Sequence, residues 1–318
     1  MSSYLFPGRN NEKTEPNRWW IRFGLRLGVS AALHPFDYSK TLIQLGYEPV
    51  PPQQGTSLLG RPILLLPNIL QYTAHIKKID GFCGCYRGLA PKMVGSLISM
   101  VVSERLTHQL GFSPQEDVKD NSELSKEEIY AQFKETLKRD IVLTVSGIVV
   151  SHPFHVITVR MMAQFVGRER LYTSIIDSIV EIWKTEGVLG FFAGLVPKLL
   201  CDVVCVVLSS STIYMLNKYL IKDHLARQYN ARITQFAFSS WLYSLQVAST
   251  CSVVSGSRLT AGQPPIMPIY RNWVDCWKDL QCRGELKRGS SLFWRSQSLQ
   301  SSSMPTAFIS LPKLARYQ

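Results

Sequence analysis

The chain has 318 residues, of which 46% are hydrophobic and only 18% charged, against about 25% charged in typical soluble domains. Its formal net charge is +12, but the Lys and Arg residues are spread along the chain, and no RNP, zinc-finger or helix-turn-helix pattern accompanies them. These features argue against an ordinary soluble domain and against a nucleic-acid partner, and they indicate a basic membrane protein.

The chain begins with a polar tail. Residues 1–18 contain no apolar core of a signal peptide, and Glu12 and Glu15 disfavour a cleaved mitochondrial presequence. We therefore expect any targeting signal to lie within the mature chain.

Several apolar stretches approach the length of a membrane span, which needs about 20 largely apolar residues. Residues 141–159 and 233–257 carry no formal charge, and we expect both to span. Residues 203–217 also qualify if Asp202, which directly precedes them, is tolerated. Two weaker candidates that carry charges are 19–45 and 89–110.

Two motifs occur twice in the same order. DGFCGCYRGLAPK at 80–92 matches EGVLGFFAGLVPK at 186–198, and HPF at 34–36 matches HPF at 152–154. The spacing between the motifs differs because the first copy carries a Pro-rich insertion, 47–67, which we expect to be an extended loop. Matched motifs in matched order indicate an internal repeat.

Each repeat is predicted to begin with a long helix that ends near HPF. A short amphipathic helix follows, at 172–185 in the second copy, with Ile175, Ile179 and Ile182 at helical spacing. An acid–Gly turn, an aromatic residue, GLxPK and a second apolar helix complete the unit, with proline at the helix start, where it is tolerated.

A third, eroded repeat is expected from its long helix at 233–258. Arg283-Gly284 stands where an acid–Gly pair is expected, and the position of HPF, near 242–245, has lost its proline. The predicted organisation is a tail at 1–18, repeats at 19–112, 113–225 (with a polar linker at 113–128) and 226–295, and a Ser-rich tail at 296–318.

Three such units resemble the mitochondrial carrier family, whose motif is Pro-x-acid-x-x-base followed by acid-Gly-x4-aromatic-base-Gly. The first copy fits this motif, and the second keeps its prolines, glycines and second acid but has His155, Thr158 and Ala193 where the motif has an acid and two bases. The matching residues are Pro35, Asp37, Lys40, Asp80, Gly81, Tyr86, Arg87 and Gly88 in the first copy, and Pro153, Glu186, Gly187, Phe192 and Gly194 in the second.

The stretches SHPFHVITVR, GFFAGLVPKLL, LIQLGYEPVPP and PPIMPIYRNWVDCW are more closely similar to the mitochondrial carrier homologue family. This resemblance implies a divergent carrier fold in the outer mitochondrial membrane. It also implies insertion of α-helical proteins, notably tail-anchored ones, into that membrane, and docking of a truncated BH3 apoptotic protein.

In a working carrier, the acid and base after each proline form a ring of ion pairs that gates one face. The first copy supplies Asp37 and Lys40, but the second supplies His155, mostly neutral near pH 7, and Thr158. The third copy supplies no matching pair, so at most one ion pair is expected across three interfaces. The substitutions therefore argue against an alternating gate.

Residues 296–318 are Ser-rich and broken by Pro305 and Pro312, so we expect no sixth spanning helix. An all-α bundle of this kind would present a hydrated polar groove to lipid. A client helix could then move its polar tail through the groove, avoiding a cost of about 2.5 kcal/mol or more per charge in hydrocarbon. The predicted groove residues are Asp202, Lys40, Lys198, Arg160, Asp37, His155, Lys92 and Asp140.

These residues also have simpler interpretations. Lys92 and Lys198 lie near helix starts, where a lysine can extend to the interface. Asp140 follows Arg139 at an expected helix entrance, and Asp37 can be a local structural partner of a base. Asp202 is hardest to explain this way, because it lies within an apolar run and shares a helix face with Lys198.

The sequence is also compatible with three other functions: a residual solute carrier, a receptor or scaffold that moves nothing, and a lipid scramblase. No GxSxG, P-loop or GxGxxG motif indicates an enzyme.

The seven cysteines form no zinc or disulfide pattern, and no Glu follows His152 and His155 at metalloprotease spacing. We expect no metal and no cofactor; the expected partners are membrane lipid and α-helical clients.

Overall fold

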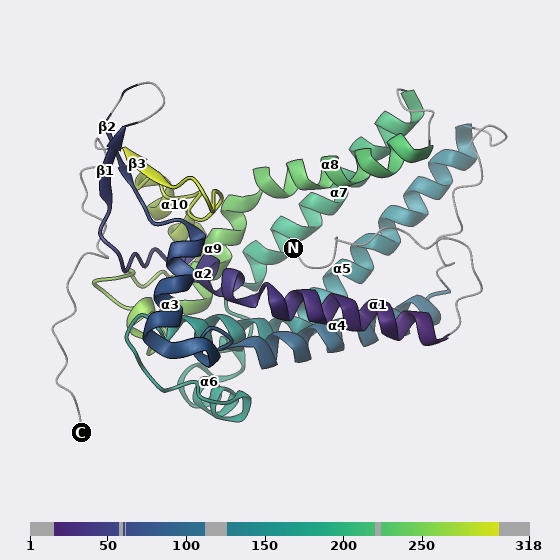
Figure 1. Cartoon of the computed structure of the whole chain (residues 1–318). Helices are drawn as coiled ribbons and strands as arrows, with labels where there is room; N and C mark the ends of the chain where they lie inside the picture. The colour runs from purple at the N-terminus through teal and green to yellow at the C-terminus, as the bar shows by residue number, and fades with distance from the viewer. Residues whose placement is uncertain (1–15, 57–59, 61, 112–125, 220–223, 299–318) are drawn as a thin grey trace. The chain divides into compact units, whose positions relative to one another are not determined.

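The computed structural model describes residues 16–56, 60, 62–111, 126–219 and 224–298 (Figure 1). The described chain is mostly helical, which confirms the all-α, carrier-like fold class. The helices are α1 (Pro16–Ala32), α2 (His34–Leu45), α3 (Ile69–Gly84), α4 (Leu89–Gln109), α5 (Lys126–Ala163), α6 (Ile175–Gly190), α7 (Leu195–Tyr219), α8 (His224–Trp241), α9 (Tyr243–Val254) and α10 (Trp273–Cys282). A 3-10 turn, η2 (Thr260–Gly262), and the strands β1 (Gln53–Thr56), β2 (Pro62–Leu65) and β3 (Ser296–Ser298) complete the elements.

The chain divides into two compact units. The first holds Met1–Leu33, Pro91–His155 and Leu195–Gln246, and the second holds His34–Ala90, Val156–Gly194 and Val247–Gln318. The borders fall beside the HPF motifs, within the two GLxPK motifs, and after the third-repeat position that lacks proline. The repeated motifs thus mark where the chain passes from one unit to the other.

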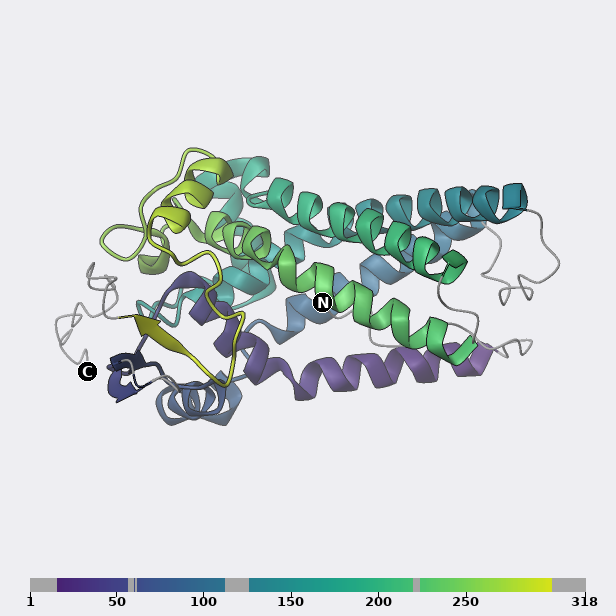
Figure 2. The ribbon, with the colours of Figure 1, turned by 90° about the horizontal axis from the view of Figure 1, so that it is seen from above.

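The predicted helix ends near the two HPF motifs have different outcomes: the long helix α1 of the first repeat ends just before HPF, as the sequence predicts (Figure 2), and the long helix of the second repeat continues past it. In the first repeat, α1 ends at Ala32 and α2 begins at His34, so that Pro35 lies in the first turn of α2, where it costs no helical hydrogen bond. In the second repeat, α5 continues through Pro153 to Ala163. The prediction of a helix end near Pro153 is therefore wrong, because neighbouring packing outweighs the single hydrogen bond that proline removes.

The expected long helix at 233–258 is also divided. Helix α8 ends at Trp241 and α9 begins at Tyr243, although no proline lies between them. Leu242 still donates its N–H to the Phe238 carbonyl, so the division is a local turn between two helices. The prediction of one spanning helix over 233–257 is therefore wrong for this stretch.

Within the described residues, two helices are long and apolar enough to cross a membrane by length and composition: 127–163 and 195–219. The first contains the predicted span at 141–159, and the second contains the predicted span at 203–217 together with Asp202. Residues 1–15, 112–125 and 299–318 lie outside the described residues, so most of the expected polar tail, of the polar linker and of the Ser-rich tail is not placed; residues 16–18 of the expected tail begin α1.

The insertion at 47–67 is more ordered than the loop that the sequence predicts. Strands β1 and β2 pair antiparallel, with Gln53 opposite Leu65, and β3 pairs antiparallel with β2, with Ile63 opposite Ser298. The three strands form one sheet in the order β1-β2-β3. The insertion therefore joins the end of the described chain to the first repeat within the second unit.

Helix α6 begins later than the predicted 172–185 and ends beyond it, at Gly190. It begins after Ser174, whose side chain accepts the Asp177 N–H, and continues through Gly187, whose φ of 67° requires glycine, to Gly190. Hydrogen bonds from the Thr173 and Ser174 hydroxyls hold the pKa of Asp177 below its usual range. Of the three isoleucines at helical spacing, Ile182 is fully buried, but Ile179 is 40% exposed.

Candidate functional site

The predicted groove residues are distributed over both units. Lys92 of α4, Asp140 and His155 of α5, and Lys198 and Asp202 of α7 belong to the first unit; Asp37 and Lys40 of α2 and Arg160 of α5 belong to the second.

In the first unit, three predicted residues from different helices are close enough to interact electrostatically. The positive charges of Lys198 and Lys92 act on His155, whose ring also lies 5.7 Å from the His152 ring. Lys92, His155 and Lys198 are half-buried. Helices α4, α5 and α7 thus bring together a basic cluster, which we define as Lys92, His155 and Lys198.

Asp202 lies one helical turn beyond Lys198 and is half-buried. Its charge acts on the thiols of Cys201 and Cys205, which are buried in the same helix. Asp202 therefore adds an acidic group beside the basic cluster within a helix that can span a membrane. A charge in such a helix is costly unless water or polar partners reach it.

Asp140 lies further along α5 and pairs with its neighbour. The Arg139 guanidinium is 3.3 Å from the Asp140 carboxylate, and both side chains are half-buried. This ion pair supplies a second polar position on α5, apart from His155.

Small residues set the distance between α4 and α5, the two helices that carry Lys92 and His155. A Cβ on Gly95 would lie 3.0 Å from the Phe154 Cβ, and a Cβ on Gly147 would lie 2.8 Å from the Ser99 Oγ. Such close approach is typical of helices that pack inside membranes, where small residues let backbones meet.

Arg160 belongs to the second unit, whereas the basic cluster belongs to the first. Its side chain is fully buried, and its two Nη atoms donate to the two Glu186 oxygens at 2.6 and 2.7 Å, while Nε donates to the Val253 carbonyl. Because every donor group faces the protein interior, we do not retain Arg160 in the groove.

This pairing compensates for a substitution in the second repeat. In the first repeat Arg87 pairs with Asp80 at 3.2 Å, but Ala193 replaces the equivalent base of the second. Glu186 thus lacks a basic residue within its own motif, and this was the signal that could have assigned Arg160 to it.

Asp37 and Lys40 of the second unit lie one turn apart on α2; Asp37 is exposed and Lys40 is half-buried. His34, in the same helix, is buried, with Nε2 3.0 Å from the Arg87 carbonyl oxygen and its ring stacked beside Tyr86. The first HPF motif thus docks on the turn that ends with Gly88, and its histidine has a structural role.

The motif glycines Gly88 and Gly194 lie where two segments of the backbone approach each other closely. A Cβ on Gly194 would lie 2.6 Å from the Ser249 carbonyl oxygen, and the Ser249 hydroxyl donates to the Gly194 carbonyl. A Cβ on Gly88 would lie 3.0 Å from the Thr158 carbonyl oxygen. Each glycine therefore lets the preceding repeat contact the helix of the next one.

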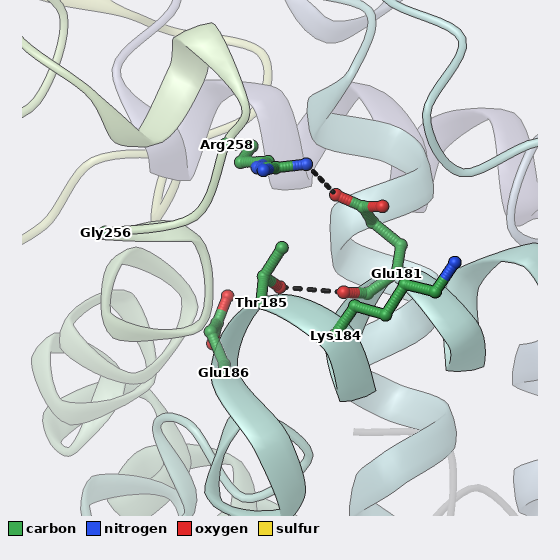
Figure 3. A pocket seen from close by; sticks show the side chains of 6 residues that line it. All are labelled: Glu181, Lys184, Thr185, Glu186, Gly256 and Arg258. Carbon is green, nitrogen blue, oxygen red and sulfur yellow. Dashed lines mark hydrogen bonds and ion pairs between the residues drawn. The ribbon is translucent and has the colours of Figure 1, made fainter.

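A polar pocket of about 420 Å³ in the second unit is separate from the predicted residues, apart from Glu186 (Figure 3). It is lined by Glu181, Lys184, Thr185, Glu186, Gly256 and Arg258. Arg258 pairs with Glu181 at 3.3 Å across this pocket. The sequence did not predict the pocket, because α6 and the segment after α9 meet only in the fold.

Within the described residues, no group of three or more His, Cys, Asp or Glu side chains could hold a metal ion. The seven cysteines are unpaired thiols, five of them buried. The functional groups of the candidate site are therefore the charged and polar side chains of the basic cluster and Asp202, which lie on largely apolar helices.

Comparisons with known proteins agree with this architecture. A model of the mitochondrial carrier protein family matches residues 142–224. Mitochondrial carrier homolog 2 of Homo sapiens is 37% identical over 276 residues, covering 84% of this chain and 91% of that protein. Mitochondrial carrier homolog 1 of Mus musculus is 34% identical over 314 residues, covering 92% of this chain and 80% of that protein.

A weaker similarity connects the chain to a solute carrier: ADP/ATP translocase 4 of Mus musculus is 27% identical over 195 residues, covering 60% of this chain and 54% of that protein. The carrier homologues match more of the chain at higher identity. With the helical fold and repeated motifs, these matches show that the chain is a membrane protein of the mitochondrial carrier fold and belongs to the mitochondrial carrier homologue family.

Proposed function

We propose that this protein inserts α-helical proteins, including tail-anchored ones, into the outer mitochondrial membrane as a multi-pass protein. The basic cluster and Asp202 would line a hydrated groove along α4, α5 and α7. Docking of a truncated BH3 apoptotic protein at the same groove, which the family resemblance implies, is part of the proposal.

The observation that carries the proposal is the position of Asp202. An acid within an apolar helix of spanning length is costly, and such acids are found where they face water or a polar path. The basic cluster, one turn away through Lys198, supports a path with groups of both signs. Such a path could solvate the polar tail of a client while its apolar helix remains in lipid.

A reconstitution experiment tests this function. The purified full chain, placed in liposomes, is expected to increase protease-protected insertion of a fluorescent tail-anchored substrate over empty liposomes. Asp202→Arg should lower insertion about tenfold or more, because the acid is replaced by a third neighbouring cation. Asp275→Arg is the matched control, because Asp275 is an exposed acid of α10, and it should leave insertion unchanged.

Equal insertion in empty and protein-containing liposomes would reject the proposed insertase. Equal insertion by the wild type and Asp202→Arg would reject only the role of Asp202 and would leave the insertase function standing.

The alternative is a residual solute carrier, which the similarity to ADP/ATP translocase 4 favours. In that case the same liposomes should show saturable uptake of a labelled metabolite such as an adenine nucleotide. Asp37→Asn should then reduce the uptake, because Asp37 belongs to the one complete acid–base motif. Uptake equal to that of empty liposomes would exclude this alternative for the nucleotide tested.

A further inference from the structure

Two buried thiols of the second unit lie against each other. Cys251 of α9 and Cys276 of α10 are both fully buried, and their side chains are hydrogen-bonded to each other. The Cys276 Sγ atom is also 3.9 Å from the Ala248 carbonyl oxygen, in the turn of α9 that precedes Cys251. We call Cys251 and Cys276 the thiol pair.

An arginine side chain connects the thiol pair to the surface. The Arg288 Nη2 atom donates to the Cys251 sulfur at 3.4 Å, and its Nη1 atom pairs with Glu285 at 3.1 Å. The Arg288 side chain is 19% exposed, so the group that contacts the Cys251 sulfur reaches solvent. The two described helices of spanning length, 127–163 and 195–219, do not include α9 or α10.

The two thiols differ in their electrostatic surroundings. The hydrogen bond with Cys276 and the positive charge of Arg288 together outweigh burial and lower the pKa of the Cys251 thiol. The same hydrogen bond, together with burial, raises the pKa of the Cys276 thiol. Because the thiolate is the form that attacks oxidants, Cys251 is suited to react first, and Cys276 is placed to react with the product.

We propose that Cys251 and Cys276 form a reversible disulfide when the protein meets hydrogen peroxide. The Cys251 thiolate attacks one peroxide oxygen, the O–O bond breaks, and the leaving hydroxide takes up a proton to become water. The Cys276 sulfur then attacks the sulfur of the Cys251 sulfenic acid, so that an S–S bond forms, the S–O bond breaks and a second water leaves. Two thiols are oxidised and one peroxide is reduced to two waters.

The disulfide would link α9 covalently to α10. It would close the loop between positions 251 and 276, and such a link restricts the unfolded chain more than the folded one. A dithiol reductant would restore both thiols by exchange. The inference is independent of the insertase function, because the thiol pair belongs to the second unit, whereas the basic cluster and Asp202 belong to the first.

Thiol mapping of the purified full chain in detergent tests the pair. The reduced protein is treated with hydrogen peroxide, the remaining thiols are blocked with N-ethylmaleimide, and linked peptides are identified by mass spectrometry. The main disulfide should join Cys251 to Cys276, although Cys83 and Cys282 are the exposed cysteines. The unfolding midpoint should rise by about 5–10 °C on oxidation and return to its starting value with dithiothreitol.

Three serine variants assign the role of each thiol. Cys276→Ser should stop at the Cys251 sulfenic acid, which dimedone captures as an adduct, and Cys251→Ser should give no adduct at Cys276. Cys282→Ser is the matched control, because Cys282 is an exposed thiol of the same helix, α10, and it should form the disulfide at the wild-type rate.

A charge variant tests the contribution of Arg288. Arg288→Gln removes the cation beside Cys251 and should slow disulfide formation about tenfold. Arg288→Lys keeps the positive charge and should slow it less. Circular dichroism shows whether each variant keeps its helix content, and the mapping and midpoint of the wild type test the disulfide without any variant.

The proposal has distinct ways to fail. No disulfide between positions 251 and 276 in the wild type, or oxidation of Cys83 or Cys282 ahead of Cys251, would overturn it. A disulfide between two protein copies in place of the internal one would overturn it as well. Equal rates in the wild type and a folded Arg288→Gln variant would overturn the role of Arg288.

Discussion

At Glu186, one side chain shows how the second repeat keeps its fold after losing part of its motif. The carrier motif supplies a base within the same turn, as Arg87 does for Asp80. With Ala193 in that place, Arg160 pairs with Glu186 from α5 and also donates to the Val253 carbonyl. Three segments of the second unit, α5, α6 and α9, therefore meet at one guanidinium.

Removing the acid from this pair should destabilise the protein. Glu186→Gln leaves the Arg160 charge buried without a counter-charge, and we expect a loss of about 3 kcal/mol, seen as a lower unfolding midpoint in detergent. Glu181→Gln is the matched control: Arg258, its partner, is 66% exposed, so the loss should be under about 1 kcal/mol. Equal midpoints for the two variants would contradict the structural role of Arg160.

At the scale of single elements, α5 combines three functions in one helix. Its apolar length can span a membrane, its small residues pack against α4, and its last residues hold Arg160 in the second unit. Pro153 does not end it, since the surrounding contacts favour continuation. In α8 and α9 the reverse occurs: the helix divides at Leu242 without proline. Proline alone is thus a poor guide to the helix ends of this protein.

The contact between α4 and α5 predicts a sensitive position on α5. Gly147→Leu should force the two helices apart, because even the first added carbon would lie 2.8 Å from the Ser99 Oγ. We expect a cost of about 1–3 kcal/mol, measured as a lower unfolding midpoint in detergent. Val150→Leu, an exposed position of α5, should be close to neutral. If both variants melt alike, the small residues do not set this contact.

At the scale of the whole molecule, the described end of the chain returns to the first repeat. Arg295 is buried, pairs with Glu48 and donates to the Pro67 carbonyl at 2.8 Å. The amides of Leu66 and Ile69 donate to the carbonyls of Arg295 and Leu292. The described residues beyond α10 thus contain no helix; they are joined to the first repeat by the Glu48–Arg295 ion pair and the pairing of β2 with β3. We call these two contacts together the clasp.

Opening the clasp should be visible by hydrogen exchange. Arg295→Gln leaves Glu48 buried without its cation, so exchange at the Leu66 and Ile69 amides should rise on the order of 100-fold. Arg283→Gln, which breaks a half-exposed pair with Asp279, should leave both rates unchanged. Unchanged exchange in Arg295→Gln would show that the strands hold the chain end without the ion pair.

The sequence by itself determined the family and the all-α fold class, because both depend on local patterns: the repeated HPF and GLxPK motifs, the acid–Gly turns and the apolar stretches of α5 and α7. It also singled out Lys92, His155, Lys198 and Asp202, whose polarity stands out against apolar neighbours. Only the tertiary structure decided the partner of Arg160, the division at Leu242 and the sheet that the insertion at 47–67 forms with residues 296–298. Each of these depends on which distant segments meet: Arg160 and Glu186 are 26 residues apart, and Glu48 and Arg295 are 247 apart. Local periodicity carries no record of such contacts, because their free energy arises only when packing removes charges and apolar surface from solvent.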